Sequence, residues 1–186
     1  MSIRKLTKDD FITSDWSGGT TTQVYIEPEN SSVAEQNFDF RISTATCELD
    51  ESPFTPYNDY NRFITPLDGI MRLVNGEEEV KLNPYDIYAF GGEDPVTSYG
   101  KVRDFNLIVN KDKYGSLRRV KFNDEFDFDV GCSTCIIFTM DSGIEFTANG
   151  ESFVLNKMDA VIIKNENVNI KLKAEDKATV LIATVS

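Results

Sequence analysis

FITPLDGIMRLVNGEEEVKLNPYDI, residues 63–87, shares its landmarks with IFTMDSGIEFTANGESFVLNKMDA, residues 137–160. The offset between the two stretches is 74 residues and falls to 73 after a one-residue gap. Asn-Gly alone would mean little, because it is a favoured hairpin turn in any protein. Four landmarks in order at a nearly constant offset indicate an internal duplication. These landmarks are Gly-Ile (69–70 and 143–144), Asn-Gly (75–76 and 149–150), Leu-Asn (82–83 and 155–156) and Asp (Asp86 and Asp159).

The rest of the chain also predicts β-structure. Short runs of alternating or β-branched residues lie between Gly, Asn, Asp and Pro turn signals. Only the neighbourhoods of Asp9–Phe11 and Tyr114–Leu117 could hold a short helical turn. The clearest predicted strands are 20–26, 38–45, 69–74, 86–90, 104–109, 135–140, 143–148, 152–156, 160–164, 168–173 and 178–185.

The repeated unit is a hairpin followed by a strand, a Leu-Asn-x-x-Asp turn and another strand. It resembles the cupin barrel, and two such units make a bicupin. We therefore expect an all-β bicupin of two cupin-like barrels packed as one compact unit. Residues 1–112 would form an N-terminal barrel with a ligand pocket, and residues 113–186 a mainly structural C-terminal barrel.

Composition narrows the chemistry. The 186 residues include 31 acidic and 19 basic side chains, for a net charge of −12, and no histidine. Without histidine there can be no Ser-His-Asp or Cys-His nucleophile system, no His-ligated metal centre and no imidazole proton shuttle. We expect no metal and no cofactor. The acidic balance argues against nucleic acid and anionic membranes as partners, and a homodimer stays open.

Charge and apolar content are unevenly distributed. Residues 101–120 carry six basic and two acidic side chains, and residues 121–130 carry one basic and four acidic ones. Both runs are interpreted as solvated surface. No stretch approaches the roughly 18 apolar residues that span a bilayer, and the first residues lack the apolar segment of a secretory signal. With only three cysteines, the expected location is a reducing cytoplasm.

Two segments near the N-terminus carry candidate ligand-binding residues. In WSGGTTT (16–22), Trp16 precedes a glycine pair that permits close backbone approach, and Thr22 can donate a hydrogen bond to an anion. A β-bulge or turn entering a strand, with Trp16 covering a core, explains the segment equally well. In FDFRIS (38–43), alternation puts Arg41 and Ser43 on one strand face. An inward Arg41 must be paired or bind an anion, whereas an outward one is ordinary surface.

Two further clusters occur only in the first repeat. Arg62 stands where the second repeat has Ile136, and Asp104 and Asn106 align with Lys177 and Thr179. An arginine with a carboxylate and an amide could fix a small polar ligand, or it could be an internal ion pair. The asymmetry favours one working barrel and one structural barrel.

Cys132 and Cys135 form a Cys-x-x-Cys motif. A thioredoxin-type site needs a helix after the motif, but the residues that follow predict a strand. A zinc site needs four ligands, and Cys47 with a carboxylate would be an uncommon set. The preferred interpretation is free strand or core cysteines, and their role stays open.

Several blocks in order resemble the HutD/Ves family, over about residues 1–182. They are WSGGTTT (16–22), FDFRISTA (38–45), SPFTPYNDYNR (52–62), PLDG (66–69), FGG (90–92) and YGKVRDFNL (99–107). The resemblance implies a bicupin fold without the usual metal site, and no catalytic residue. Its implied ligand-binding residues are Trp16, Thr22, Arg41, Ser43, Arg62, Asp104 and Asn106. The chain departs from the family pattern at residues 17–20, Val24 and Phe40, which leaves the identity of the ligand open.

The resemblance also implies a function. Family members are encoded with histidine-degradation genes and are thought to restrain that pathway by binding an acidic intermediate such as formylglutamate; others are stress-induced. We expect a non-catalytic protein that binds a small anionic metabolite, in which truncating Arg41 or Arg62 abolishes binding and spares the fold. Alternatives are a metal-independent isomerase or epimerase using Tyr60 and Asp104, and an interaction protein with an acidic docking face.

Overall fold

The computed structural model describes residues 2–164 and 167–186. They form 17 strands and no helix, so the all-β prediction is confirmed. Among these residues there is accordingly no helix long and apolar enough to cross a membrane. The chain divides into a first unit, Phe11–Tyr114, and a second unit, Met1–Asp10 with Gly115–Ser186.

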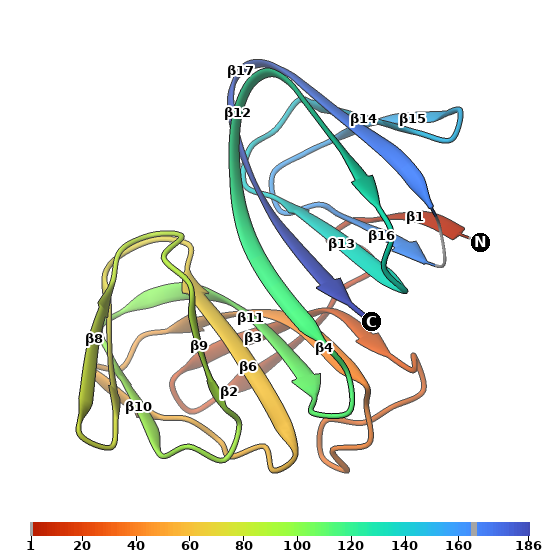
Figure 1. Ribbon diagram of the computed structural model, residues 1–186. Coiled ribbons are helices and arrows are strands. Elements are labelled where there is room, and N and C mark those ends of the chain that lie inside the picture. The colour runs from red at the N-terminus through yellow and green to blue at the C-terminus, as the bar shows by residue number, and fades with distance from the viewer. Residues whose placement is uncertain (1, 165–166) are drawn as a thin grey trace. The chain divides into compact units, whose positions relative to one another are not determined.

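The first unit contains two antiparallel sheets (Figure 1). Their facing side chains form one apolar core, to which β6 contributes Ile64, β7 contributes Leu73 and β10 contributes Val96. The six-stranded sheet has the order β2 (Ile12–Trp16), β3 (Gly19–Glu27), β4 (Phe40–Cys47), β11 (Val102–Asn110), β6 (Tyr60–Pro66) and β9 (Tyr88–Gly91). The four-stranded sheet has the order β5 (Glu51–Pro53), β10 (Val96–Tyr99), β7 (Met71–Asn75) and β8 (Glu78–Leu82).

The second unit is one seven-stranded antiparallel sheet whose apolar core holds Phe146 and Ile182. The long strands β12 and β17 pair along almost their whole length and bend together (Figure 1). The strand order is β1 (Ser2–Leu6), β16 (Ala160–Lys164), β13 (Thr134–Thr139), β17 (Val168–Val185), β14 (Ile144–Ala148) and β15 (Glu151–Leu155), with β12 (Gly115–Val130) also paired to β17.

Two features differ from the sequence-based expectation. β1 pairs with β16, Ser2 opposite Lys164, so residues 2–6 lie in the sheet of the second unit and not in an N-terminal barrel of residues 1–112. Tyr114–Leu117 leads into strand β12 instead of a helical turn. In β12 the charged side chains lie mostly outside, whereas Phe122 and Val130 are buried, so a charge-rich run is a strand with one apolar face.

The two similar stretches share part of their backbone geometry, which is consistent with duplication. The Asp86 and Asp159 carboxylates each accept the backbone N–H three residues earlier at 2.9 Å. The preceding residues, Tyr85 and Met158, both have positive φ, 71° and 70°. The two Asn-Gly pairs, however, occupy different turn positions. Asn149 and Gly150 are the two central residues of their hairpin, whereas Asn75 ends β7 and the turn begins at Gly76.

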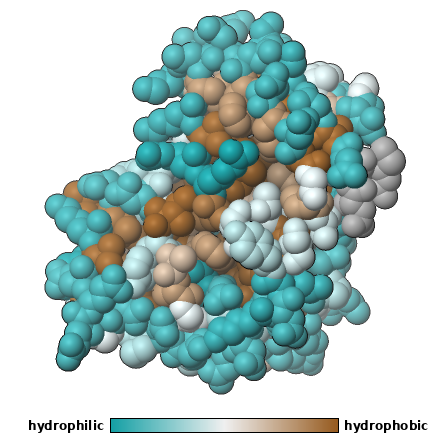
Figure 2. Space-filling model, viewed as in Figure 1, coloured by the Kyte–Doolittle hydropathy of each residue, from teal (hydrophilic) through white to brown (hydrophobic). Residues whose placement is uncertain are grey.

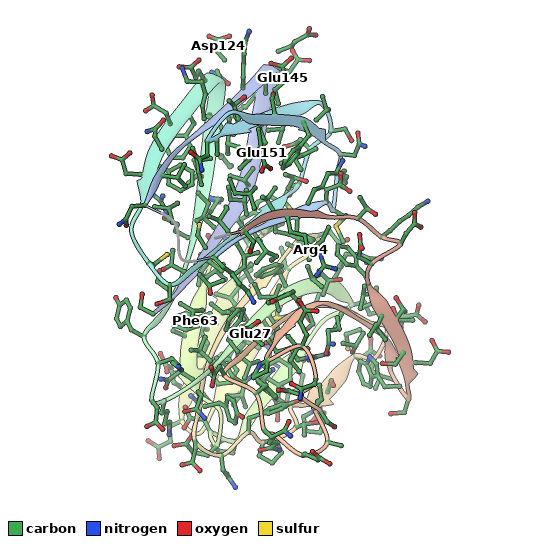
Figure 3. All side chains as sticks on the ribbon, turned by 90° about the vertical axis from the view of Figure 1, so that its right-hand side faces the viewer. Arg4, Glu27, Phe63, Asp124, Glu145 and Glu151 are labelled. Atoms are coloured by element: carbon green, nitrogen blue, oxygen red, sulfur yellow. The ribbon has the colours of Figure 1, made fainter. Side chains whose placement is uncertain are left out.

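Exposed acidic side chains occur on both units, for example Glu48 and Asp50 on the first. Figure 3 labels Asp124, Glu145 and Glu151 in the second unit, and all three are exposed. On the face shown in Figure 2, hydrophilic residues cover much of the surface. The net charge of −12 is thus carried mainly at the surface, where water solvates it.

Candidate functional site

One face of three adjacent strands of the first unit carries a polar cluster. Register places Ser43 of β4 opposite Asn106 of β11 and Arg41 opposite Ile108, which in turn pairs with Arg62 of β6. Because strand side chains alternate between faces, these residues point to the same side of the sheet. They line a cavity of about 270 Å³, closed on other sides by residues such as Trp16, Phe54 and Tyr57.

Arg41 presents a largely unpartnered cation to this cavity. Its side chain is only 8% exposed. Its Nε donates to Gln23 Oε1 at 2.9 Å, which fixes the plane of the guanidinium. Within residues 2–164 and 167–186, no carboxylate pairs with Arg41 and no acceptor is recorded for its two terminal nitrogens. Burial lowers the pKa of Arg41, which remains charged at neutral pH.

Arg62 is held by two hydrogen bonds and by aromatic rings. Its Nη1 donates to the Thr55 carbonyl at 3.3 Å and its Nη2 to Asn106 Oδ1 at 3.1 Å. Its guanidinium carbon lies 4.7 Å from the centre of the Phe54 ring and 5.0 Å from that of Phe90. Its Nε is buried and has no acceptor among the described residues, and burial lowers its pKa to about 10. Arg62 therefore anchors the wall of the cavity, and its truncation would leave a gap under the rings.

Asp104 and Asn106 complete a hydrogen-bonded chain from Arg62. Asn106 accepts from Arg62 through Oδ1 and donates through Nδ2 to Asp104 Oδ1 at 2.8 Å. Asp104 is 5% exposed, and burial raises its pKa to about 6 despite the opposing effects of Asn106 and Arg62. Both the oxygen and the nitrogen of the Asn106 amide are therefore hydrogen-bonded within the protein, so Asn106 positions its neighbours. Asp104 lines the cavity with a carboxyl group whose pKa is about 6.

The structure brings six of the seven sequence-derived candidates together around this cavity. They are Trp16, Arg41, Ser43, Arg62, Asp104 and Asn106. Thr22 lies elsewhere. It pairs with Thr44 on the opposite strand face, and its hydroxyl hydrogen-bonds to Thr13 at 2.9 Å. Thr21 lines the cavity in its place.

Sequence reasoning missed the residues that hold the two arginines. Gln23 orients Arg41, and the segment Phe54–Tyr57 supplies a carbonyl and two aromatic rings to Arg62. The only sequence signal for this segment was its block SPFTPY, which suggested the family but no role. The segment has no strand periodicity from which its side-chain directions could be predicted.

The suggested Tyr60–Asp104 pair does not form. Tyr60 does not line the cavity and is buried in an apolar cluster with Phe38 and Ile108. Its hydroxyl lies 2.6 Å from the Gln36 carbonyl and 2.9 Å from that of Phe38, so backbone acceptors take its proton. No group of three Cys, Asp or Glu side chains suited to a metal occurs in the described part of the chain.

Gly92 holds the segment that carries Tyr57. Its N–H donates to the Tyr60 carbonyl at 2.7 Å, and its own carbonyl accepts from the Tyr57 N–H at 2.8 Å. A Cβ at this position would lie 2.2 Å from the Tyr57 carbonyl oxygen, which is rigid backbone. We expect Gly92→Ala to lower the free energy of unfolding by about 2 kcal/mol through overpacking.

Urea unfolding of the two proteins measures this difference. Gly131→Ala is a suitable control, because its Cβ would meet nothing closer than Asn167 Oδ1 at 3.8 Å. Equal unfolding midpoints for Gly92→Ala and the unmodified chain would contradict the close approach.

The chain is similar to known proteins in sequence and in fold. A family model described as HutD matches residues 8–182. A protein from Pseudomonas putida, described as an uncharacterised 21.2 kDa protein in the hutC 3′ region, is 30% identical over 155 residues. The match covers 80% of this chain and 79% of that protein.

Solved structures share the fold. A conserved protein of unknown function from Pseudomonas aeruginosa PAO1 has a TM-score of 0.90 at 24% identity, and HutD from Pseudomonas fluorescens SBW25 has a TM-score of 0.78 at 24% identity; both cover 100% of each chain. A cupin 2 conserved barrel domain protein from Leptotrichia buccalis has a TM-score of 0.65 at 11% identity, covering 98% of this chain and 96% of that one. The fold is therefore all-β and cupin-like, as the sequence predicted.

Proposed function

Because this chain belongs to the HutD family, we propose that it is a non-catalytic binding protein for a small acidic metabolite of the formylglutamate kind. In this proposal, binding in the first unit regulates histidine utilisation. The name of HutD from P. fluorescens and the hutC-region position of the P. putida relative support the pathway. In this proposal the protein acts in the cytoplasm, and its three free cysteines support that location.

The observation that carries the proposal is the buried guanidinium of Arg41. A buried charge is costly unless it is paired. Arg41 has one hydrogen bond, to the neutral Gln23, and faces an open cavity. A ligand carboxylate would supply the missing counter-charge, and its two oxygens match the two terminal nitrogens of a guanidinium.

The far end of the cavity favours a second kind of ligand group. Arg41 and Asp104 line the same cavity, and Asp104 lies opposite Ala45, four residues along β4 from Arg41. That spacing is about 13 Å along the strand. Asp104 accepts a hydrogen bond from a ligand N–H. An elongated acid with a carboxylate at one end and an amide N–H at the other therefore suits the site.

Size limits the ligand as well. A cavity of about 270 Å³ is slightly smaller than drug-binding pockets, which are about 300–1,000 Å³. Because Trp16, Phe54 and Tyr57 line it, the middle of the ligand is best apolar. In this proposal Asn106 and Arg62 position the wall of the cavity, and the Ser43 hydroxyl is available to hydrogen-bond to the ligand.

Isothermal titration calorimetry tests the function directly. Formylglutamate is compared with glutamate and with analogues in which each carboxylate is replaced by a neutral carboxamide. We expect at least tenfold weaker binding when the carboxylate that meets Arg41 is neutralised, because a charge-assisted hydrogen bond contributes about 1.5–3 kcal/mol. Thr22→Ala, altered on the opposite strand face, should bind like the unmodified chain. Absence of binding by every acid at millimolar concentration would contradict the proposal.

A further inference from the structure

The two cysteines of the Cys-x-x-Cys motif lie together in the second unit, apart from the cavity of the first. Cys135 is fully buried on β13, whereas Cys132 is half-buried at a bend between β12 and β13. Both thiols are free, and the Cys132 side chain packs against the apolar core that contains Cys135. The Cys132 thiol donates a hydrogen bond to the Thr134 carbonyl, with 3.2 Å between sulfur and oxygen. The bend thus brings two thiols separated by two residues to one core, and one of them is accessible.

The surroundings of Cys132 stabilise its thiolate. Contact with the Cys135 thiol lowers the pKa of Cys132 to about 7. Burial opposes this shift, and nearby backbone groups add to it. The same contact, together with burial, raises the pKa of Cys135. A reactive outer thiolate beside a protonated inner thiol is the arrangement that thiol–disulfide exchange requires.

We propose that Cys132 and Cys135 form a redox pair that small disulfides of the glutathione type convert to an intramolecular disulfide. No helix is needed for this role, because the neighbouring Cys135 thiol takes its place. The pair differs from Cys47, which is buried alone in the first unit. The site is independent of the metabolite-binding function.

The exchange proceeds in two balanced steps. The Cys132 thiolate attacks one sulfur of the small disulfide, forms a mixed disulfide and releases the first small thiolate, which takes up a proton. Cys135 then loses its proton and attacks the Cys132 sulfur of the mixed disulfide, which releases the second small thiol. In total, two protein thiols lose two electrons and two protons, and one small disulfide is reduced to two thiols.

Mass spectrometry of the whole chain tests the pair. The reduced protein is equilibrated with excess oxidised glutathione, and the remaining thiols are blocked with a maleimide. We expect the loss of two hydrogens, one blocked thiol at Cys47, and a peptide map that joins Cys132 to Cys135. Cys135→Ser should instead accumulate a glutathione adduct on Cys132, and Cys47→Ser should still form the disulfide.

Alkylation kinetics give a second readout that needs no variant. At pH 7 the rate of iodoacetamide reaction at Cys132 should be about half its high-pH plateau, against about 3% for an ordinary cysteine with a pKa of about 8.5. The proposal is overturned if three thiols remain blockable after equilibration, if a disulfide involves Cys47, or if Cys132 alkylates like an ordinary cysteine.

Discussion

Arg41→Ala is expected to weaken the binding of a formylglutamate-type acid by at least 100-fold and to leave the fold unchanged. Truncating one partner of a buried, hydrogen-bonded charge pair costs about 2–5 kcal/mol of binding free energy, and a factor of 100 corresponds to about 2.7 kcal/mol. In the free protein, Arg41 bears the cost of burial with a single hydrogen bond, to Gln23. Its removal should therefore leave the free energy of unfolding equal or slightly higher.

Calorimetry and urea unfolding measure the two effects separately. Arg72→Ala is the matched control, because it removes the same charge from the same unit. Arg72 is 40% exposed, pairs with Glu79 at 3.3 Å and packs on the Tyr99 ring outside the cavity. Affinities that fall equally in both variants would indicate a general electrostatic effect, and an unchanged affinity in Arg41→Ala would exclude Arg41 from the site.

Asp104 is expected to make the first unit less stable as the pH rises from about 4 to about 6. Burial raises the pKa of this carboxyl from 3.8 to about 6 in the folded protein. Between these values the folded state binds a proton that the unfolded state has released, so folding is favoured at the acidic end of the window. A difference of about two units corresponds to roughly 3 kcal/mol, fully lost once the pH exceeds the folded pKa.

Asp104→Asn isolates this contribution, because an amide cannot ionise and its oxygen can still accept from Asn106 Nδ2. We expect the free energy of unfolding of the unmodified chain, relative to Asp104→Asn, to fall by roughly 3 kcal/mol between pH 4 and pH 7. Asp15→Asn, altered at an exposed carboxylate of the same unit, controls for the loss of one charge. Parallel curves for the unmodified chain and Asp104→Asn would show that Asp104 ionises as freely as it does in water.

The sequence predicted most of the strands and one face of the site. In a strand, successive side chains point to opposite faces of the sheet, so an alternating pattern shows which residues share a face. In FDFRIS every second residue is polar, so Arg41 and Ser43 had to share a strand face. Asp104 and Asn106 follow the same rule in β11. The absence of histidine by itself excludes the usual histidine-ligated metal site of cupins.

Other features had no local signal. Residues 20–23, TTTQ, are all polar, so they show no alternation of polar and apolar residues. The sequence therefore gives no indication that Thr21, and not Thr22, faces the cavity. The aromatic support of Arg62 comes from the proline-containing segment after β5, where no periodicity exists. The two Asn-Gly pairs occupy different positions in their turns. The first central residue of the turn, which has a positive φ, is Gly76 in one hairpin and Asn149 in the other.

The pairing of β1 with β16 has a consequence for the order of folding. Residues 11–114 contain every strand of their own two sheets, so the strand pairing of this unit requires no residue that is synthesised later. Ser2–Leu6, although synthesised first, must wait for Ala160–Lys164. At about 5–20 residues per second, the ribosome needs several seconds to reach that partner after the first unit is made. The first unit would thus be assembled while the first strand of the chain is still unpaired.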